Sequence, residues 1–128
     1  MRKIITAFAL LIIFSARVEA VAISDSEIED ATEIVAEKLR YWNCTEIKIW
    51  YGGDELNSEE NIAYMNELAL ANGFEEKFTA CMVLYSDFHS PPDDGDISAW
   101  EYDTDYENYS WYFGLYEDGE WKLLTWGY

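Results

Sequence analysis

The fold is decided by the stretch YSWYFGLY (Tyr109–Tyr116), EDGE (Glu117–Glu120) and WKLLTWGY (Trp121–Tyr128). Two runs rich in aromatic residues flank Asp118-Gly119, a dipeptide that favours the two-residue turn of a β-hairpin. We therefore predict an antiparallel hairpin over these residues. With a two-residue loop, the expected pairs are Tyr116 with Trp121, Phe113 with Leu124, and Trp111 with Trp126.

Both faces of this hairpin would carry large apolar side chains. Alternation along the strands gives one face Trp111, Phe113, Leu115, Leu124 and Trp126, with Lys122 near the rim. The other face receives Tyr112, Gly114, Tyr116, Trp121, Leu123 and Thr125. We expect helices to cover one side of the sheet and an aromatic surface to remain on the other. Tyr112, Tyr116 and Trp121 are the candidate ligand-binding residues of that surface, although aromatic residues at strand spacing also suit a plain core.

Two helices are predicted before the hairpin. Ser24 and Glu27 have the spacing of a capping box, and an apolar stripe follows at helical spacing, made of Ile28, Ala31, Val35, Leu39 and Trp42. This pattern predicts a helix over about Asp25–Trp42. A second apolar stripe, formed by Ile62, Met65, Leu68 and Ala69, lies between Asn57 and the stop signal Asn72-Gly73.

The remaining strands complete the fold class. Residues 44–51 alternate with a period of two, and Phe78–Phe88 has the near-continuous apolar centre of a strand covered on both faces. The polar residues 89–108 are interpreted as a loop. The order helix, strand, helix and three strands predicts an α+β domain, with a curved antiparallel sheet of about four strands packed on two helices.

The first twenty residues have the three parts of a secretory signal peptide. Arg2 and Lys3 are followed by the apolar run Ile4–Phe14, which is too short for the roughly 20 residues of a spanning helix. Val18 and Ala20 are the small residues expected before a cut after Ala20. Residues 21–128 would then form one domain that acts outside the cytoplasm, without the cysteine that a lipid anchor needs near the cut.

The charge restricts the partners. The formal net charge is −18, and removal of Arg2, Lys3, Arg17 and Glu19 with the signal would make it −20. Such a charge repels nucleic acid and anionic membranes, and it favours a basic partner. The chain is rich in aromatic residues, 17% in all, and this predicts a folded domain rather than an acidic disordered segment.

Cys44 and Cys81 are the two cysteines, and an even number in an exported chain indicates a disulfide. Each cysteine lies on a predicted strand, and neighbouring strands can bring the Cα atoms within the required distance of about 7 Å. The alternative is a pair of separate buried thiols.

No catalytic residue, cofactor or metal is predicted. His89 is the only histidine, and Asp87 with Ser86 or Ser90 beside it resembles a hydrolase triad only in composition, because neighbours on a strand point to opposite faces. The sequence has neither a second histidine nor a CxxC motif that could bind zinc. Calcium is a weaker alternative at the acidic loop, whose carboxylates are Asp93, Asp94, Asp96, Asp103, Asp105 and Glu107. The sequons at Asn43 and Asn108 are interpreted as chance matches, because the signal is of bacterial type.

Several short patterns resemble a family of small exported proteins of unassigned function from Gram-positive bacteria. The matching residues are Cys44, Thr45, Ile47, Ile49, Tyr51, Asp54 and Glu55, then Val83, Leu84, Ser86 and Phe88, then Trp111, Leu115, Glu120, Trp121, Lys122 and Trp126–Tyr128. The element order is also similar to the cystatin-like, nuclear transport factor 2-like fold, which implies a curved sheet around helices and a binding or dimerisation role. No catalytic residue of its enzymatic members can be matched here.

These observations predict an exported, non-enzymatic module that binds a protein or cell-envelope partner. The alternative is a pocket protein for a small apolar or aromatic ligand. An enzyme that acts through a carboxylate or tyrosine in such a pocket is the third and weakest hypothesis.

Overall fold

The computed structural model describes residues 22–73, 77–92 and 101–128. The predicted signal peptide and its cut after Ala20 lie outside the described residues, as do Asp93, Asp94 and Asp96 of the acidic loop. In the described part of the chain, no helix combines the length and the hydropathy needed to cross a membrane.

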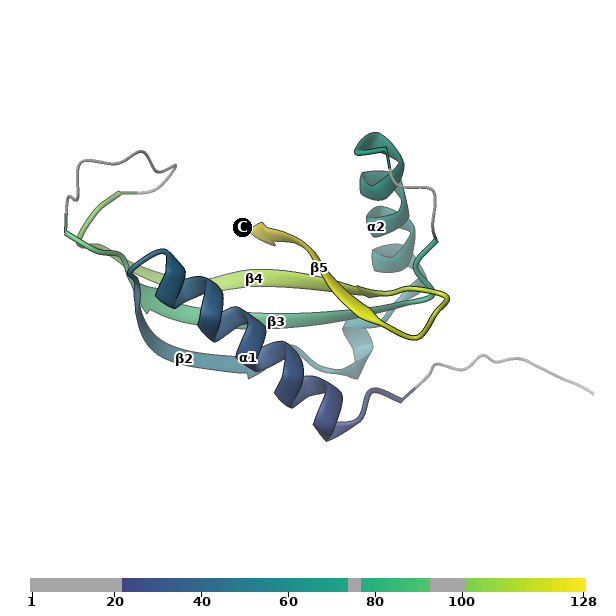
Figure 1. Cartoon of the computed structure of the whole chain (residues 1–128), viewed down its shortest axis with the longest axis horizontal. Coiled ribbons are helices and arrows are strands. Elements are labelled where there is room, and N and C mark those ends of the chain that lie inside the picture. The colour runs from purple at the N-terminus through teal and green to yellow at the C-terminus, as the bar shows by residue number, and fades with distance from the viewer. Residues whose placement is uncertain (1–21, 74–76, 93–100) are drawn as a thin grey trace, which may run out of the picture.

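Two helices and four strands follow one another in the predicted order (Figure 1). They are α1 (Asp25–Tyr41), β2 (Thr45–Tyr51), the short 3-10 helix η1 (Asp54–Leu56), α2 (Glu59–Ala71), β3 (Ala80–His89), β4 (Asp105–Leu115) and β5 (Trp121–Gly127). The strands form one antiparallel sheet in the order β2-β3-β4-β5. The predicted α+β class, with a four-stranded sheet packed against two helices, is confirmed.

Helix α1 forms where the capping box and the apolar stripe predicted it. The Ser24 hydroxyl accepts a hydrogen bond from the Glu27 amide, and the Glu27 carboxylate accepts one from the Ser24 amide. The buried residues of the helix are Ala31, Val35, Ala36 and Leu39. Lys38 and Arg40 lie in the last turn, where their charges favour the helix dipole.

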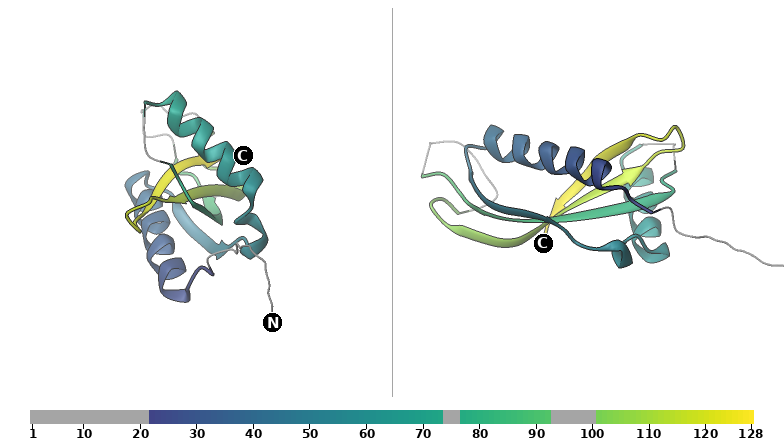
Figure 2. Two further views of the ribbon diagram at one scale, coloured as in Figure 1. Left: turned by 90° about the vertical axis from the view of Figure 1, so that its right-hand side faces the viewer. Right: turned by 90° about the horizontal axis from the view of Figure 1, so that it is seen from below.

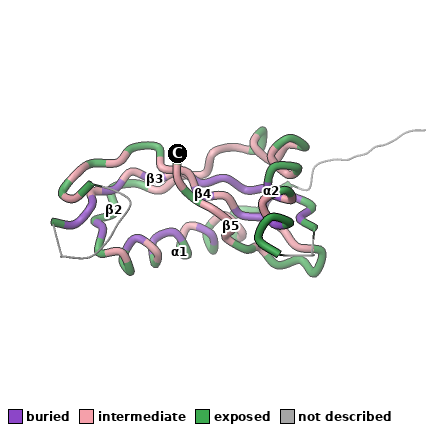
Figure 3. Tube along the Cα trace, turned by 90° about the horizontal axis from the view of Figure 1, so that it is seen from above, coloured by how far each residue is buried: buried purple, intermediate pink, exposed green. Residues whose placement is uncertain are grey.

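Strand β3 is the centre of the core because both of its faces are buried (Figure 3). Met82, Leu84 and Phe88 pack with Val35 and Leu39 of α1. The alternate residues Cys81 and Val83 pack with Met65 and Ala69 of α2. The helices therefore lie on opposite faces of the sheet (Figure 2), not on one side as the hairpin pattern suggested. The physical reason is that both faces are apolar and each needs a cover.

The β4–β5 hairpin is confirmed, but its turn is longer than the predicted two residues. Tyr116 N–H donates to Glu120 O at 2.9 Å, and Gly119 N–H donates to Tyr116 O at 2.9 Å. Gly119 has a φ of 90°, as the third residue of a three-residue hairpin loop requires. Leu115 therefore pairs with Trp121 and Phe113 with Leu123, so two of the three predicted pairs are wrong.

A bulge at Leu124 restores the predicted register farther along the hairpin. The pairing shifts between Tyr112 and Phe113, and beyond that point Trp111 pairs with Trp126 as predicted. Between the turn and the bulge, the side chains of β5 exchange faces, because a shift of one residue moves every side chain across the sheet. Trp121 and Leu123 pack in the cluster under α1, whereas Leu124 packs in the cluster under α2.

The predicted Cys44–Cys81 disulfide is wrong, because both cysteines are buried free thiols. Cys44 precedes Thr45, which pairs with His89 at one end of β3, whereas Cys81 lies near the other end. Cys81 and His89 are eight positions apart along the strand and therefore roughly 26 Å apart, far beyond the reach of about 7 Å for a disulfide. Burial raises the pKa of Cys44 to about 11 and that of Cys81 to about 12.

Candidate functional site

The three residues predicted to share a ligand-binding face do not lie together. Tyr112 meets the edge of Tyr64 from α2, with 5.9 Å between the ring centroids, and Tyr116 stacks on Phe78 at 4.7 Å. Trp121 lies on the opposite face of the sheet, in the cluster that packs against α1. The bulge at Leu124 and the longer turn explain this separation.

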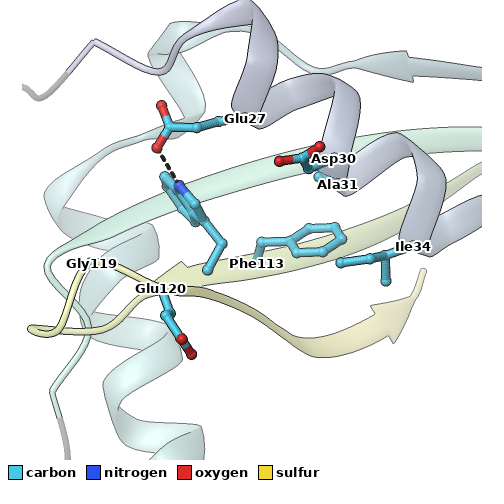
Figure 4. Close-up of a pocket in the computed structure, with 8 residues that line it drawn as sticks. Glu27, Asp30, Ala31, Ile34, Phe113, Gly119 and Glu120 are labelled. Atoms are coloured by element: carbon cyan, nitrogen blue, oxygen red, sulfur yellow. Dashed lines mark hydrogen bonds between the residues drawn. The ribbon is translucent and has the colours of Figure 1, made fainter.

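Trp121 instead helps to line a cavity of about 320 Å³ between α1 and the β4–β5 hairpin (Figure 4). We call this cavity the α1–β5 groove, and its lining residues are Glu27, Asp30, Ala31, Ile34, Phe113, Gly119, Glu120 and Trp121. The groove exists because α1 packs mainly against β2 and β3. The N-terminal half of α1 therefore runs beside the hairpin and does not fill the space above β4.

The inner part of the groove is apolar. Phe113 and Ala31 are buried, and Trp121 is partly buried against the same cluster. Ile34, which is 38% exposed, lies at the side of the groove on α1. One signal in the sequence could have indicated a cavity here. Ile34 is an apolar residue among acidic ones, and it lies off the apolar stripe that forms the core.

Glu27 connects the start of α1 with the hairpin. Its Oε1 accepts hydrogen bonds from the amide and the hydroxyl of Ser24, each at 2.9 Å, and its Oε2 accepts one from Trp121 Nε1 at 2.7 Å. These bonds, with the Ser24 amide first and the Trp121 indole second, lower the pKa of Glu27. The carboxylate therefore stays ionised at neutral pH, at the rim of an apolar cavity.

Asp30 lies one helical turn beyond Glu27 and points over the cavity (Figure 4). Within the described ranges, its carboxylate has no hydrogen-bond or ion-pair partner. Glu120 differs, because its carboxylate lies 3.3 Å from Lys122 Nζ. The negative charge offered to a ligand in the groove therefore comes from Asp30 and Glu27.

His89 lies elsewhere, at the end of β3, and does not belong to a triad. Its Nδ1 is 2.6 Å from Asp105 Oδ1, and its Nε2 is 2.7 Å from Asp103 Oδ1. Both bonds, with that to Asp105 first, raise the pKa of His89. Ser90 Oγ donates to the carbonyl of Glu101, and Ser86 Oγ accepts from Trp111 Nε1, so neither hydroxyl is paired with the imidazole.

Metal ligands do not converge in the described ranges, where no group of three or more His, Cys, Asp or Glu side chains could hold an ion. The calcium alternative cannot be placed, since Asp93, Asp94 and Asp96 lie outside these ranges. Comparison with models of protein families finds no match, and neither do comparisons with curated proteins and with solved structures. The α1–β5 groove is therefore the basis for a functional proposal.

Proposed function

We propose that this chain is an exported, non-enzymatic binding module that holds a positively charged group of its partner in the α1–β5 groove. The observation that carries the proposal is the combination of an apolar interior, formed by Phe113, Ala31 and Trp121, with two carboxylates at the rim. An amphipathic cation matches this arrangement, since its stem can contact the apolar walls while its charge meets Asp30 and Glu27.

The charge of the whole molecule supports the same proposal. A net charge of −18 attracts a basic partner at long range and raises its rate of association. Pockets that enclose drug-sized ligands have volumes of about 300 to 1,000 Å³. A cavity of about 320 Å³ lies at the bottom of that range and suits a single side chain or a small amine.

The state of Glu27 favours binding over acid catalysis. A carboxyl group that donates protons near neutral pH needs a raised pKa, usually through burial in apolar surroundings. The pKa of Glu27 is shifted downward, and both of its oxygens already accept hydrogen bonds. Its arrangement suits a fixed negative charge.

A small apolar or aromatic ligand is the second candidate, and the interior formed by Phe113, Ile34 and Trp121 favours it. The two candidates differ in the role of Asp30. A neutral aromatic ligand gains nothing from that carboxylate, whereas a cation loses an ionic hydrogen bond when it is removed.

We place the module outside the cytoplasm because residues 1–20 have the three parts of a cleavable signal. The resemblance to small exported domains of the cystatin-like, nuclear transport factor 2-like type supports the same location and a binding role. A basic protein or a basic component of the cell envelope is the partner class that this proposal implies.

An NMR titration with n-pentylamine at neutral pH tests the proposal, and 1-pentanol serves as the uncharged comparison. We expect the amine to bind with a dissociation constant on the order of millimolar, as its few heavy atoms allow. Asp30→Asn should weaken binding by roughly five- to tenfold through loss of an ionic hydrogen bond. Glu29→Gln, which removes the same charge from an exposed neighbour outside the groove, should have little effect. Equal binding of amine and alcohol would contradict the proposal and favour the apolar ligand.

A further inference from the structure

We infer that the α1–β5 groove selects a primary alkylammonium group, the chemistry of a lysine side chain, over guanidinium and quaternary ammonium groups of equal charge. The inference rests on the proposed function and names the class of cation that the same groove takes.

The hydrogen-bond acceptors in the groove suit an ammonium group. Glu27 Oε1 already accepts two hydrogen bonds from Ser24, and its Oε2 accepts one from Trp121, so Glu27 does not present two free parallel oxygens. A guanidinium ion binds best to a free pair of oxygens, through two parallel N–H donors, and of the two carboxylates only that of Asp30 offers such a pair. An ammonium ion has three diverging donors instead, and these can be shared between two separate carboxylates.

The spacing of the carboxylates leads to the same conclusion. Residues three positions apart on a helix are neighbours on one surface, with about 5 to 6 Å between their Cβ atoms. Glu27 and Asp30 have this spacing on α1, and both line the groove. A compact cation between them can bind one oxygen of each. A quaternary ammonium ion has no N–H donor for either oxygen and would keep only its attraction to the charges and to the Trp121 ring.

The apolar interior adds a dependence on chain length. An alkyl stem that enters beside Ile34 and Phe113 would leave water, and each buried methylene favours binding by about fourfold. The groove is open to solvent along α1, since Asp30 and Ile34 are exposed. A lysine side chain can therefore enter while its main chain remains outside. A lysine of a basic partner protein is the occupant that we infer.

The test is a set of titrations of the whole protein, followed by the shift of the Trp121 indole N–H, which Trp121→Phe identifies. The probes are n-propylamine, n-pentylamine, n-pentylguanidine and n-pentyltrimethylammonium at one ionic strength, together with Nα-acetyl-lysine N-methylamide. We expect n-pentylamine to bind at least about threefold more tightly than the other two pentyl cations, and more tightly than n-propylamine by roughly fourfold per methylene. The lysine derivative should bind about as well as n-pentylamine. This result would show that the groove accepts a lysine side chain with its main chain attached, and not only a free amine.

Three outcomes would overturn the inference, and they differ in what they say of the proposed function. If the guanidinium or quaternary probe binds as tightly as the amine, the groove holds cations without this selectivity, and the proposed function stands. If n-pentylamine binds and the lysine derivative does not, the ligand is a free amine and not a protein side chain. If no cation binds, or Asp30→Asn changes nothing, the proposed function fails together with the inference.

Discussion

At the scale of single residues, Glu27 has two structural roles. It closes the capping box of α1 with Ser24 and accepts the indole hydrogen bond of Trp121 from the hairpin. Glu27→Ala should therefore lower the free energy of unfolding by about 1 to 2 kcal/mol, from one cap interaction and one hydrogen bond. Urea denaturation monitors this change. Glu29→Ala removes an exposed glutamate of the same helix and should stay within about 0.5 kcal/mol of the unchanged protein; equal losses in both variants would show that Glu27 has no special role.

His89 makes the stability depend on pH in a defined direction. Asp105 and then Asp103 raise its pKa in the folded protein above the value of about 6.5 in the unfolded chain. The stabilisation by the charged imidazole is therefore complete below about pH 6.5 and is lost as the pH rises through the folded-state pKa. The difference in free energy of unfolding between the unchanged protein and His89→Gln should be largest below about pH 6.5 and should shrink as the pH rises through the folded-state pKa of His89.

The same residue gives a direct spectroscopic check. His89 is the only histidine, so its imidazole signals can be assigned without ambiguity. Their titration should give a pKa above 6.5, and Asp105→Asn should lower this pKa more than Asp103→Asn. A pKa at or below 6.5 in the unchanged protein would mean that neither aspartate holds the ring in solution.

At the scale of elements, the packing of α2 against the sheet requires a glycine at position 114 of β4. A Cβ atom added at Gly114 would overlap the Phe78 ring and lie 2.7 Å from Met65 Cε. Gly114→Ala should therefore reduce the free energy of unfolding by about 1 to 3 kcal/mol through overpacking. Gly119→Ala is the control for backbone strain alone, since Gly119 has a φ of 90° and an added Cβ would meet nothing within 4 Å. This substitution should lower the free energy of unfolding by about 1 kcal/mol. A neutral Gly114→Ala would contradict the close packing of α2 on β4.

The elements also show what could be predicted from the sequence. The capping box placed the start of α1 correctly, and the alternating and aromatic runs placed the strands in their order along the chain. The start of β4 was wrong, because this strand begins at Asp105, within the polar residues 89–108 that were interpreted as a loop. The hairpin register was wrong near the turn, because Asp118-Gly119 occurs in both two- and three-residue loops and only the second matches the Tyr116–Glu120 pairing. No residue in the run Leu123–Trp126 signals a β-bulge, so the faces of Trp121 and Leu124 could not be predicted.

The groove was missed for a related reason. It depends on which strands α1 covers and on the face that Trp121 occupies, and both are set by tertiary packing. In the sequence, Glu27 is marked only as a helix cap, and Asp30 is one of several acidic residues off the apolar stripe of the helix. Both local descriptions are correct, but the hairpin residues that complete the groove lie more than eighty positions farther along the chain.

At the scale of the whole molecule, the sheet separates the two cysteines. Cys44 packs on the α1 side and Cys81 on the α2 side, near opposite ends of β3. Their raised pKa values, about 11 and 12, keep both as neutral thiols at pH 7. We expect neither to react with a thiol reagent in the native protein and both to react after denaturation. The intact mass should be the same with and without reductant, and a gain of two hydrogens on reduction would contradict the described arrangement.

The whole molecule also decides between two ligand surfaces, the groove on the α1 side and the aromatic residues on the α2 side. A chemical-shift perturbation experiment with n-pentylamine on uniformly labelled protein distinguishes them in one measurement. We predict that the largest changes occur at Ala31, Ile34 and Phe113 and at the indole N–H of Trp121, with little change at Tyr112 and Tyr116. Largest changes at Tyr112 and Tyr116, or no change at the groove residues at saturating amine, would contradict a cation-binding site between α1 and the hairpin.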